Sequence, residues 1–556
     1  MFFQKQISFD ILSLFCFTES SCESDSNDED NQNSDDNSEE DAVLSDEDST
    51  SEESDEDVAA VIPNVALVQN TMVSKDGNEE WSKTPPNQPA HPRAHNIVRQ
   101  PTGPTRMAAQ TCGQSVDTSF KLFITPEIAN IIVQHTNEEG RRQLADRWID
   151  TNVEEVYTFI GLLLLAGVYH AKNESIHELW SQEHGRPVFN RTMSRNRFCL
   201  LRRCLRFDDK ATREQRRQQD KFSPLRNIMN LFSTKCRANY NPSPFITVDE
   251  QLVTFRGRCP FKMFIPSKPG KYGMKVWMLC DAESSYCINL QPYIGRTMGV
   301  RDVGQGTRVV LELTDHITGS GRHITGDNFF TNITLLRSLL GRRMTYTGTL
   351  RKNKGEVAPQ FLPNARRVQH SSVFGFQNDV TMVSYVPKKS KAVLLLSTFH
   401  HDAEVAGENE KYKPKIILDY NKYKAGVDTL DQLVRSYSCR RKCRRWPFTM
   451  FCNLLDIAAY NSYILFIALH PNYANRVSHK RRIFLQELAK SLLPPTLEIH
   501  PLAPIQQLPA PGPIRPRGTT RCHVCPRKED KKTRLVCSNC QKSICKHHSK
   551  IVCNNC

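Results

Sequence analysis

The stretch Phe245–Phe255 reads FITVDEQLVTF, and it decides the fold class of this chain. Its β-branched and aromatic residues favour a strand. Asp249 interrupts the apolar strand at its centre, where a carboxylate carries a desolvation cost unless it is paired or bound to a metal. We therefore expect a catalytic sheet in which Asp249 takes part in the site.

The segments that follow predict the rest of this sheet. In order, we expect strands over Lys275–Cys280 and Tyr286–Ile294, a helix over Arg308–Ile317, a strand over Arg322–Gly326, a helix over Asn332–Leu340 and a strand over Met344–Leu350. This α/β order is typical of an RNase H-like sheet. Residues 353–414 are polar and strand-rich and predict an insertion, and residues 424–437 and Phe448–Leu469 predict helices.

Helical patterns dominate upstream of the sheet. Thr125 before Pro126 predicts a helix start, Thr151–Tyr169 predicts a buried helix, and Ser194 predicts a helix cap. The polar face of the helix after Ser194 is basic and continues downstream, with Arg195, Arg197, Arg202, Arg203, Arg206, Arg213, Arg216 and Arg217. Either a solvated surface or a DNA contact would explain this face.

Three further aspartates could join Asp249. Asp327 ends a predicted strand, and Asp428 and Asp431 lie three apart in AGVDTLDQL, so a helix would place them on one face. Converging carboxylates make a hard-oxygen site suited to Mg²⁺ (or Mn²⁺), and two such ions can cut a phosphodiester. Taken singly, an aspartate at a strand end is more typical of a turn, and Asp281 has the same local setting as Asp327.

Charge is divided sharply along the chain. Residues 1–60 carry one basic and 20 acidic residues, so the other 496 carry 73 basic and 40 acidic ones. A basic body indicates a polyanionic partner, most simply nucleic acid. The acidic segment 19–57 predicts disorder, and our hypothesis is that this tail competes with DNA for the basic body. The most apolar run, Val156–Tyr169, is short of a membrane span, so we expect no membrane partner.

The C-terminal cysteines form pairs with two-residue spacing. The pairs are Cys522/Cys525, Cys537/Cys540, Cys545/His548 and Cys553/Cys556, eight ligands that suit two Zn²⁺ ions. A cross-brace would give one ion the first and third pairs and the other ion the second and fourth. His547 is a rival ligand, but the spacing favours His548. Flanking basic residues supply charge for DNA or for import into the nucleus.

Several long motifs resemble the piggyBac transposase family. They are TVDEQLVTFRGRCPFKMFIPSKPGKYGMK (Thr247–Lys275), TGDNFFT (Thr325–Thr331), AGVDTLDQL (Ala425–Leu433) and RRWPF (Arg444–Phe448). The resemblance runs from about residue 115 to the end. It implies that Asp249, Asp327 and Asp428 are the catalytic triad, with Asp431 a fourth acidic residue. The implied activity is cut-and-paste transposition of double-stranded DNA, with hairpin transposon ends joined to TTAA targets.

Composition, ligand spacing and the resemblance together predict a division into domains. We expect a disordered acidic region and linker over 1–114, a helical DNA-binding and dimerisation domain over 115–244 completed by 438–492, and a catalytic domain over 245–352 and 415–437. An insertion domain over 353–414, a proline-rich linker over 493–518 and a zinc-binding domain over 519–556 complete the division. The expected partners are transposon-end and target DNA, a second copy in a homodimer, and chromatin. The alternative is a domesticated DNA- or chromatin-binding protein without transposition activity.

Basic and aromatic residues near the aspartates are the expected DNA contacts. Basic side chains bind phosphates, and a ring can stack on a base. The candidates are Arg256, Arg258, Lys271, Arg351, Lys354, Arg440, Arg441, Arg445 and Trp446. For Trp446, the residues alone leave core packing and DNA contact open, and the resemblance favours DNA contact.

Overall fold

The computed structural model describes residues 70–86, 97–113, 115–266, 268–295, 303–494, 520–536 and 542–549. The expected disordered segment 19–57 lies outside these residues, and so does nearly all of the proline-rich linker 493–518. The expected zinc ligands Cys537, Cys540, Cys553 and Cys556 also lie outside them.

A mixed sheet forms the core of the α/β part, as the order of strands and helices predicted. Its central strands are β5 (Phe245–Thr254), β7 (Tyr272–Asp281), β8 (Cys287–Pro292), β9 (His323–Gly326) and β10 (Thr345–Leu350). They lie side by side in the order β8-β7-β5-β9-β10, and the short strand β6 (Lys262–Phe264) also pairs with β7. The β5, β7 and β8 pairings are antiparallel, whereas β9 runs parallel to both β5 and β10.

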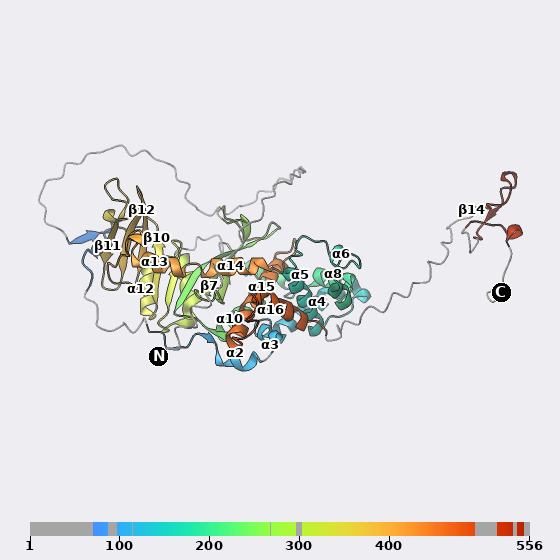
Figure 1. The fold of residues 1–556 in the computed structure, drawn as a ribbon, viewed down its shortest axis with the longest axis horizontal. Helices are drawn as coiled ribbons and strands as arrows, with labels where there is room; N and C mark the ends of the chain where they lie inside the picture. Colours follow the sequence, from blue (N-terminus) through green and yellow to red (C-terminus); the bar gives the residue numbers. More distant parts are fainter. Residues whose placement is uncertain are drawn as a thin grey trace. The chain divides into compact units, whose positions relative to one another are not determined.

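Two pairs of helices pack on the central strands. Helices α11 (Gln305–Thr314) and α12 (Ile333–Gly341) contact each other, and between them they contact β7, β8 and β10. Helices α13 (Lys415–Tyr423) and α14 (Gly426–Ser436) contact β5, with α13 also on β10 and β13 and α14 also on β7. Figure 1 shows α12 and α13 beside β10, and α14 beside β7.

The sheet extends further than the sequence predicted. Strands β11 (Ser372–Phe376), β12 (Thr381–Lys388) and β13 (Lys391–Ser397) form a meander, and β13 pairs antiparallel with β10. The strands of the predicted insertion 353–414 therefore belong to the same sheet as β10. Cross-strand hydrogen bonds between β10 and β13 account for this continuity.

The N-terminal part supplies a second correction. Residues up to 114 were expected to be disordered or linker, yet β1 (Thr71–Val73) and β2 (Glu80–Ser82) form a hairpin. Ser82 of β2 pairs with Phe376 of β11, so the hairpin joins the sheet at its edge. The turn contains Asp76-Gly77, with Gly77 at φ +71, a combination that favours tight hairpins and is readable in the sequence.

The helical part surrounds a long buried helix, α15 (Trp446–Leu469). The other helices are α2 (Arg106–Thr111), α3 (Val116–Lys121), α4 (Pro126–Leu144), α5 (Val153–Val168), α6 (Ile176–Leu179), α7 (Pro187–Thr192), α8 (Arg195–Cys204), α9 (Arg213–Gln219), α10 (Arg226–Asn239) and α16 (Lys480–Ser491). A two-residue ladder joins β3 (Gly103–Pro104) to β4 (Tyr240–Asn241). The predicted caps are confirmed, since Thr125 and Ser194 accept hydrogen bonds from the backbone N–H groups of Ile128 and Arg197.

Helix α15 departs from the expectation that no apolar run reaches membrane length. Among the described helices it alone is long and apolar enough to cross a membrane, but 72% of its most apolar window is buried inside the protein. Contacts with α3, α14 and α16 account for this burial. Its composition is therefore that of a core helix.

Several arginines of the basic segment 195–217 are engaged within the protein, whereas Arg195, Arg203 and Arg217 are exposed. Arg197 pairs with Glu155 at 2.5 Å, and Arg206 pairs at 2.7 Å with Glu139, whose side chain is 1% exposed. Downstream, Arg213 and Arg216 both pair with Asp208. These arginines connect helices of this part, which is a third use besides the solvated surface and the DNA contact considered from the sequence.

Candidate functional site

Strands β5 and β9 bring Asp249 and Asp327 together. The parallel register pairs Val248 with Gly326, so the next residue of each strand is an aspartate at the same level of the sheet. Glu250 joins them, and one carboxylate oxygen of each of the three residues lies within 4.8 Å of the others. The sequence predicted the two aspartates and missed Glu250, although an Asp-Glu pair inside an apolar strand was a visible signal.

The crowded carboxylates perturb one another. Burial, followed by the negative charges of Glu250, Asp327 and Asp428, raises the pKa of Asp249 well above its usual range. Burial and Glu250 also raise the pKa of Asp327, against the opposing charges of Lys275 and Arg351. Ionised carboxylates this close are favourable only when a cation offsets their repulsion. The donor set therefore fits a divalent cation that prefers oxygen ligands.

Helix α14 brings the other two aspartates to β5. Its first residue is Gly426, where a Cβ would lie 2.7 Å from the Thr247 hydroxyl, so glycine permits the close approach. Asp431 accepts a 3.0 Å hydrogen bond from the Gln251 amide and pairs with Arg435 at 2.6 Å. The Gln251 bond ties α14 to β5, whereas the Arg435 pair lies within α14. Asp431 is not one of the three carboxylates that lie within 4.8 Å of one another.

Asp428 lies at the exposed edge of the cluster. Its side chain is 63% exposed and pairs with Lys268 at 3.5 Å, yet it is close enough for its charge to raise the pKa of Asp249. The three residues of the predicted triad thus share one region, with Asp249 and Asp327 in direct proximity and Asp428 beside them. They come from three segments separated by long stretches of sequence.

Two lysines complete the electrostatics of the site. Lys268 and Lys275 each lie 3.9 Å from the Glu250 carboxylate. Lys275 also lies over the Trp277 ring, 4.0 Å from its centroid, and burial lowers its pKa. Both lysines were visible in the basic run after Asp249, but only the fold distinguishes them from Lys271, which is exposed.

Asp281 is a turn residue. It is fully buried and accepts hydrogen bonds from the backbone N–H groups of Ser243, Glu283 and Ser284 and from the Ser284 hydroxyl. The three donors of Glu283 and Ser284 close the turn between β7 and β8, and the Ser243 N–H ties this turn to the segment before β5. Asp281 and Asp327 have similar local sequences and differ in their tertiary position, which the sequence could not supply.

The expected DNA contacts fall into three groups. Arg256, Arg258, Lys271 and Arg351 are exposed, and Lys354 and Arg440 are partly buried. Arg441, Arg445 and Trp446 are engaged inside the protein.

The engaged residues have specific intramolecular partners. Arg441 donates to the carbonyls of Ala171 and Glu174. Arg445 donates to the carbonyls of residues 202, 203 and 205, and burial lowers its pKa to about 10. Trp446 is 9% exposed and packs on Phe222 and Phe261, with ring centroids 5.3 and 4.9 Å away. Core packing is therefore the alternative that the structure supports for Trp446.

The C-terminal segment holds a second cluster. A small hairpin, β14 (Thr520–Arg521) with β15 (Lys532–Thr533), precedes the single turn Lys546–His548. Ligand atoms of Cys522, Cys525, Cys545 and His548 all lie within 4.8 Å of one another. This is the expected grouping of the first and third pairs, and it selects His548 over His547.

The spacing of these ligands suits zinc. The Nδ1 atom of His548 lies 3.3 to 3.9 Å from the three sulfurs, and Cys525 and Cys545 have their sulfurs 3.6 Å apart. Tetrahedral Zn²⁺ with ordinary bond lengths requires ligand separations of about 3.6 to 3.8 Å. Although burial acts in the opposite direction, backbone N–H donors led by that of Cys545 lower the pKa of Cys522 to about 6, which favours the thiolate.

Comparisons with known proteins agree with this architecture. The sequence model of the family described as Transposase IS4 matches residues 117–463. The chain is 23% identical over 395 residues to the Homo sapiens PiggyBac transposable element-derived protein 3, covering 68% of this chain and 65% of that protein. It is 22% identical over 365 residues to the Homo sapiens PiggyBac transposable element-derived protein 2, covering 62% and 60%. The match thus spans less than two thirds of each relative.

A solved structure gives a longer match. The chain is similar to the protein in the cryo-EM structure of a piggyBac transposase synaptic complex with hairpin DNA, with a TM-score of 0.67 and 37% identity. The match covers 82% of this chain and 100% of that one. With the family match over residues 117–463, these similarities show that the chain belongs to the piggyBac transposase family.

Proposed function

We propose that this protein is a metal-dependent DNA transposase that cuts and rejoins phosphodiester bonds. The observation that carries the proposal is the convergence of Asp249, Asp327 and Asp428 from β5, the end of β9 and the start of α14. In our interpretation, the strand order around them is that of an RNase H-like sheet. Family membership supports the same reaction class.

The carboxylates of Asp249, Asp327 and Asp428 would hold Mg²⁺ or Mn²⁺. When bound, such an ion supplies an activated water and stabilises the charge that develops at phosphorus. The hydrogen bond between Asp431 and Gln251 would hold α14 against β5 and so keep Asp428 beside the other two carboxylates. Lys268 and Lys275 would offset the negative charge of Glu250.

The exposed basic residues would bind DNA phosphates. Arg256 and Arg258 follow β5 directly, Lys271 directly precedes β7, and Arg351 follows β10. These charges therefore lie at the ends of strands that carry the carboxylates or pair with the strands that carry them. Phosphate contacts of this kind position DNA and make binding depend on salt. We place the reaction in the nucleus, on double-stranded transposon ends held by a homodimer.

The finer steps of the reaction rest on the family relationship. The similar solved structure is a synaptic complex with hairpin DNA. By analogy, the 3′-OH freed by the first cut would form a hairpin at the transposon end, and reopening would allow joining to TTAA. Two Zn²⁺ ions would fold the C-terminal segment, one on Cys522, Cys525, Cys545 and His548 and one on Cys537, Cys540, Cys553 and Cys556.

A second candidate is a domesticated DNA- or chromatin-binding protein without transposition activity. The similarity to two transposable element-derived human proteins favours it. The retained carboxylate cluster favours the enzyme. A genomic copy flanked by inverted repeats and TTAA would support transposition, whereas a single copy without them would support the alternative.

The test is incubation of the full chain with its flanking terminal repeats and Mg²⁺. We expect nicks and hairpin ends, and their loss in Asp249→Asn. Asp315→Asn is the matched control, because that carboxylate is 77% exposed and pairs with Arg342 outside the cluster. Absence of cleavage by the wild-type chain, or full activity of Asp249→Asn, would overturn the proposal.

A further inference from the structure

We propose that the β1–β2 hairpin is a positioning element that holds the loop 351–357, which carries Arg351 and Lys354, beside Asp327. The inference rests on the proposed function for its consequence in DNA cleavage, but the contacts that carry it are independent of that function. The hairpin would make residues 70–84 part of the catalytic unit, in a segment that the sequence assigned to a linker.

The tip of the hairpin bonds directly to the loop backbone. The N–H groups of Lys75 and Asp76 donate to the carbonyls of Val357 and Gly355, each at 3.2 Å. The Lys75 ammonium donates to the Lys352 carbonyl at 3.1 Å. A Cβ on Gly355 would lie 2.6 Å from the Asp76 carboxylate, so glycine permits this close approach.

Trp81 is a second contact between the hairpin and the loop. Its side chain is fully buried, and its indole N–H donates to the Glu356 carbonyl at 3.2 Å. Its ring meets Phe361 edge-on, with centroids 6.3 Å apart. A buried indole with its N–H bonded combines packing and a directional contact. The loop is therefore held at residues 352, 355, 356 and 357 by the hairpin.

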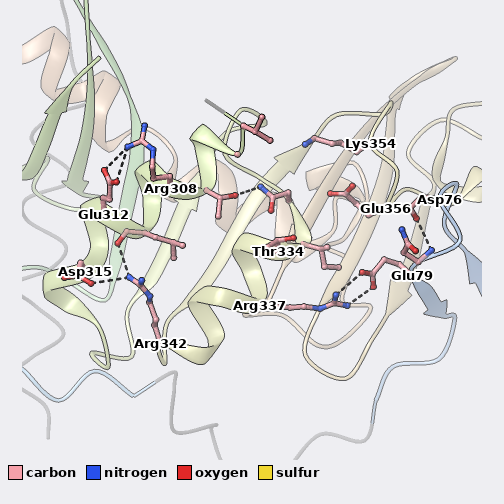
Figure 2. A pocket seen from close by; sticks show the side chains of 17 residues that line it. Asp76, Glu79, Arg308, Glu312, Asp315, Thr334, Arg337, Arg342, Lys354 and Glu356 are labelled. Carbon is pink, nitrogen blue, oxygen red and sulfur yellow. Dashed lines mark hydrogen bonds and ion pairs between the residues drawn. The ribbon is translucent and has the colours of Figure 1, made fainter. Parts of the chain in front are cut away.

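An ion pair between a buried glutamate and a surface arginine fixes the hairpin to the sheet and its helix. Glu79 is 7% exposed and accepts two hydrogen bonds from Arg337 of α12, at 2.9 and 2.7 Å, and a third from Gln377 at 2.7 Å. Figure 2 shows this pair in a cleft of about 1070 Å³, with Lys354 and Glu356 on the same side as Asp76. The hairpin, the loop and α12 thus line one cleft.

The loop connects this anchor to the candidate active site. Arg351 donates to the Asn328 side chain at 3.1 Å, and Asn328 follows Asp327 directly. The loop's own backbone hydrogen bonds, from Lys354 to the Arg351 carbonyl and from Val357 to the Lys354 carbonyl, are both 3.3 Å and lie at the long end of the usual range. The hairpin adds four hydrogen bonds of 3.1 to 3.2 Å to these two, and it therefore supplies most of the hydrogen bonds described for the loop backbone.

The experiment compares full-length variants by hydrogen exchange of the peptide 351–357. Trp81→Ala removes the anchor and should raise exchange of this peptide about tenfold, since fewer contacts lower the free energy of local opening. Trp81→Phe keeps the ring and loses the N–H, so an intermediate increase is expected. Deletion of residues 1–69 removes the acidic tail and leaves the hairpin, so exchange should not change. Unchanged exchange of β7 confirms that each variant folds.

A double-mutant cycle on DNA cleavage then separates positioning from general stability. If Trp81 acts through Arg351, the variant Trp81→Ala/Arg351→Ala should be no slower than Arg351→Ala alone. Rate losses that multiply would overturn the inference, and so would unchanged exchange of the loop in Trp81→Ala. If the wild-type chain does not cut DNA, the proposed function fails, and the exchange experiment alone decides whether the hairpin holds the loop.

Discussion

The substitution Asp456→Asn should remove a pH-dependent loss of folding stability that arises from a buried carboxyl group in the core next to α14. Asp456 lies in α15, is 7% exposed, and accepts hydrogen bonds from the Ser438 hydroxyl at 2.6 Å and the Cys439 N–H at 2.8 Å. These bonds hold the segment between α14 and α15. Burial, opposed by these hydrogen bonds, raises the pKa of Asp456 from 3.8 to about 6.

The sign and size of the stability effect follow from the linkage between protonation of Asp456 and folding. A carboxyl whose folded pKa is raised leaves the protein most stable below pH 3.8, and stability falls as pH rises from there through 6. The full shift is worth ~3 kcal/mol, of which about 1.4 kcal/mol is lost between pH 5 and pH 7.5. Asparagine can accept from Cys439 and donate to Ser438 without ionising. Its advantage over aspartate should therefore grow with pH by that amount.

The assay is thermal unfolding of wild type and Asp456→Asn from pH 5 to pH 7.5. The difference between their transition temperatures should widen by about 2 °C in favour of asparagine, given the size of the chain. Asp281→Asn is the control, because four donors face that carboxylate and an amide would leave one facing another donor. It should destabilise at every pH. A wild-type/Asp456→Asn difference that is constant with pH would refute the reasoning.

Four other outcomes are expected. His548→Ala should lower the zinc content measured by atomic emission by one ion per chain, whereas His547→Ala should leave it unchanged. Trp446→Ala should destabilise by about 3–5 kcal/mol in chemical unfolding because it empties a packed site, and DNA affinity of the folded fraction should not change. Lys275→Met should tighten Mn²⁺ binding by about fivefold in calorimetry, because a positive charge beside the carboxylates is lost; weaker binding would contradict this. Deleting residues 1–60 should tighten non-specific DNA binding at low salt, and unchanged affinity would refute competition by the tail.

Local patterns in the sequence were sufficient to predict the central strand, several helix starts and the chemistry of the metal ligands. β-branched and aromatic residues predicted β5 with Asp249 inside it, and Thr125 and Ser194 marked helix starts that the structure confirms. The two-residue spacing of the C-terminal pairs predicted a metal cluster and favoured His548. Such signals are readable because strand-forming residue types, capping and short ligand spacing depend on neighbours in the chain.

Contacts across the chain required the tertiary structure. The sequence could not rank Asp327 above Asp281, since only the parallel pairing of β9 with β5 places Asp327 beside Asp249. It could not show that Arg445 and Trp446 face inward, because basic and aromatic residues suit both a core and a DNA surface. Residues 71–82 were also assigned to a linker from the sequence alone, although the Asp76-Gly77 pair was a hairpin signal.

The sequence by itself determined the family motifs, the carboxylate and thiolate chemistry, and the division of charge between an acidic tail and a basic body. Only the tertiary structure decided that Glu250 joins Asp249 and Asp327, that Asp431 holds α14 in place, and that an N-terminal hairpin holds the loop after β10. The physical reason is that residue types and short spacings are local properties. Proximity of carboxylates, burial of a guanidinium and pairing of sheet edges depend on segments that meet only when the chain has folded.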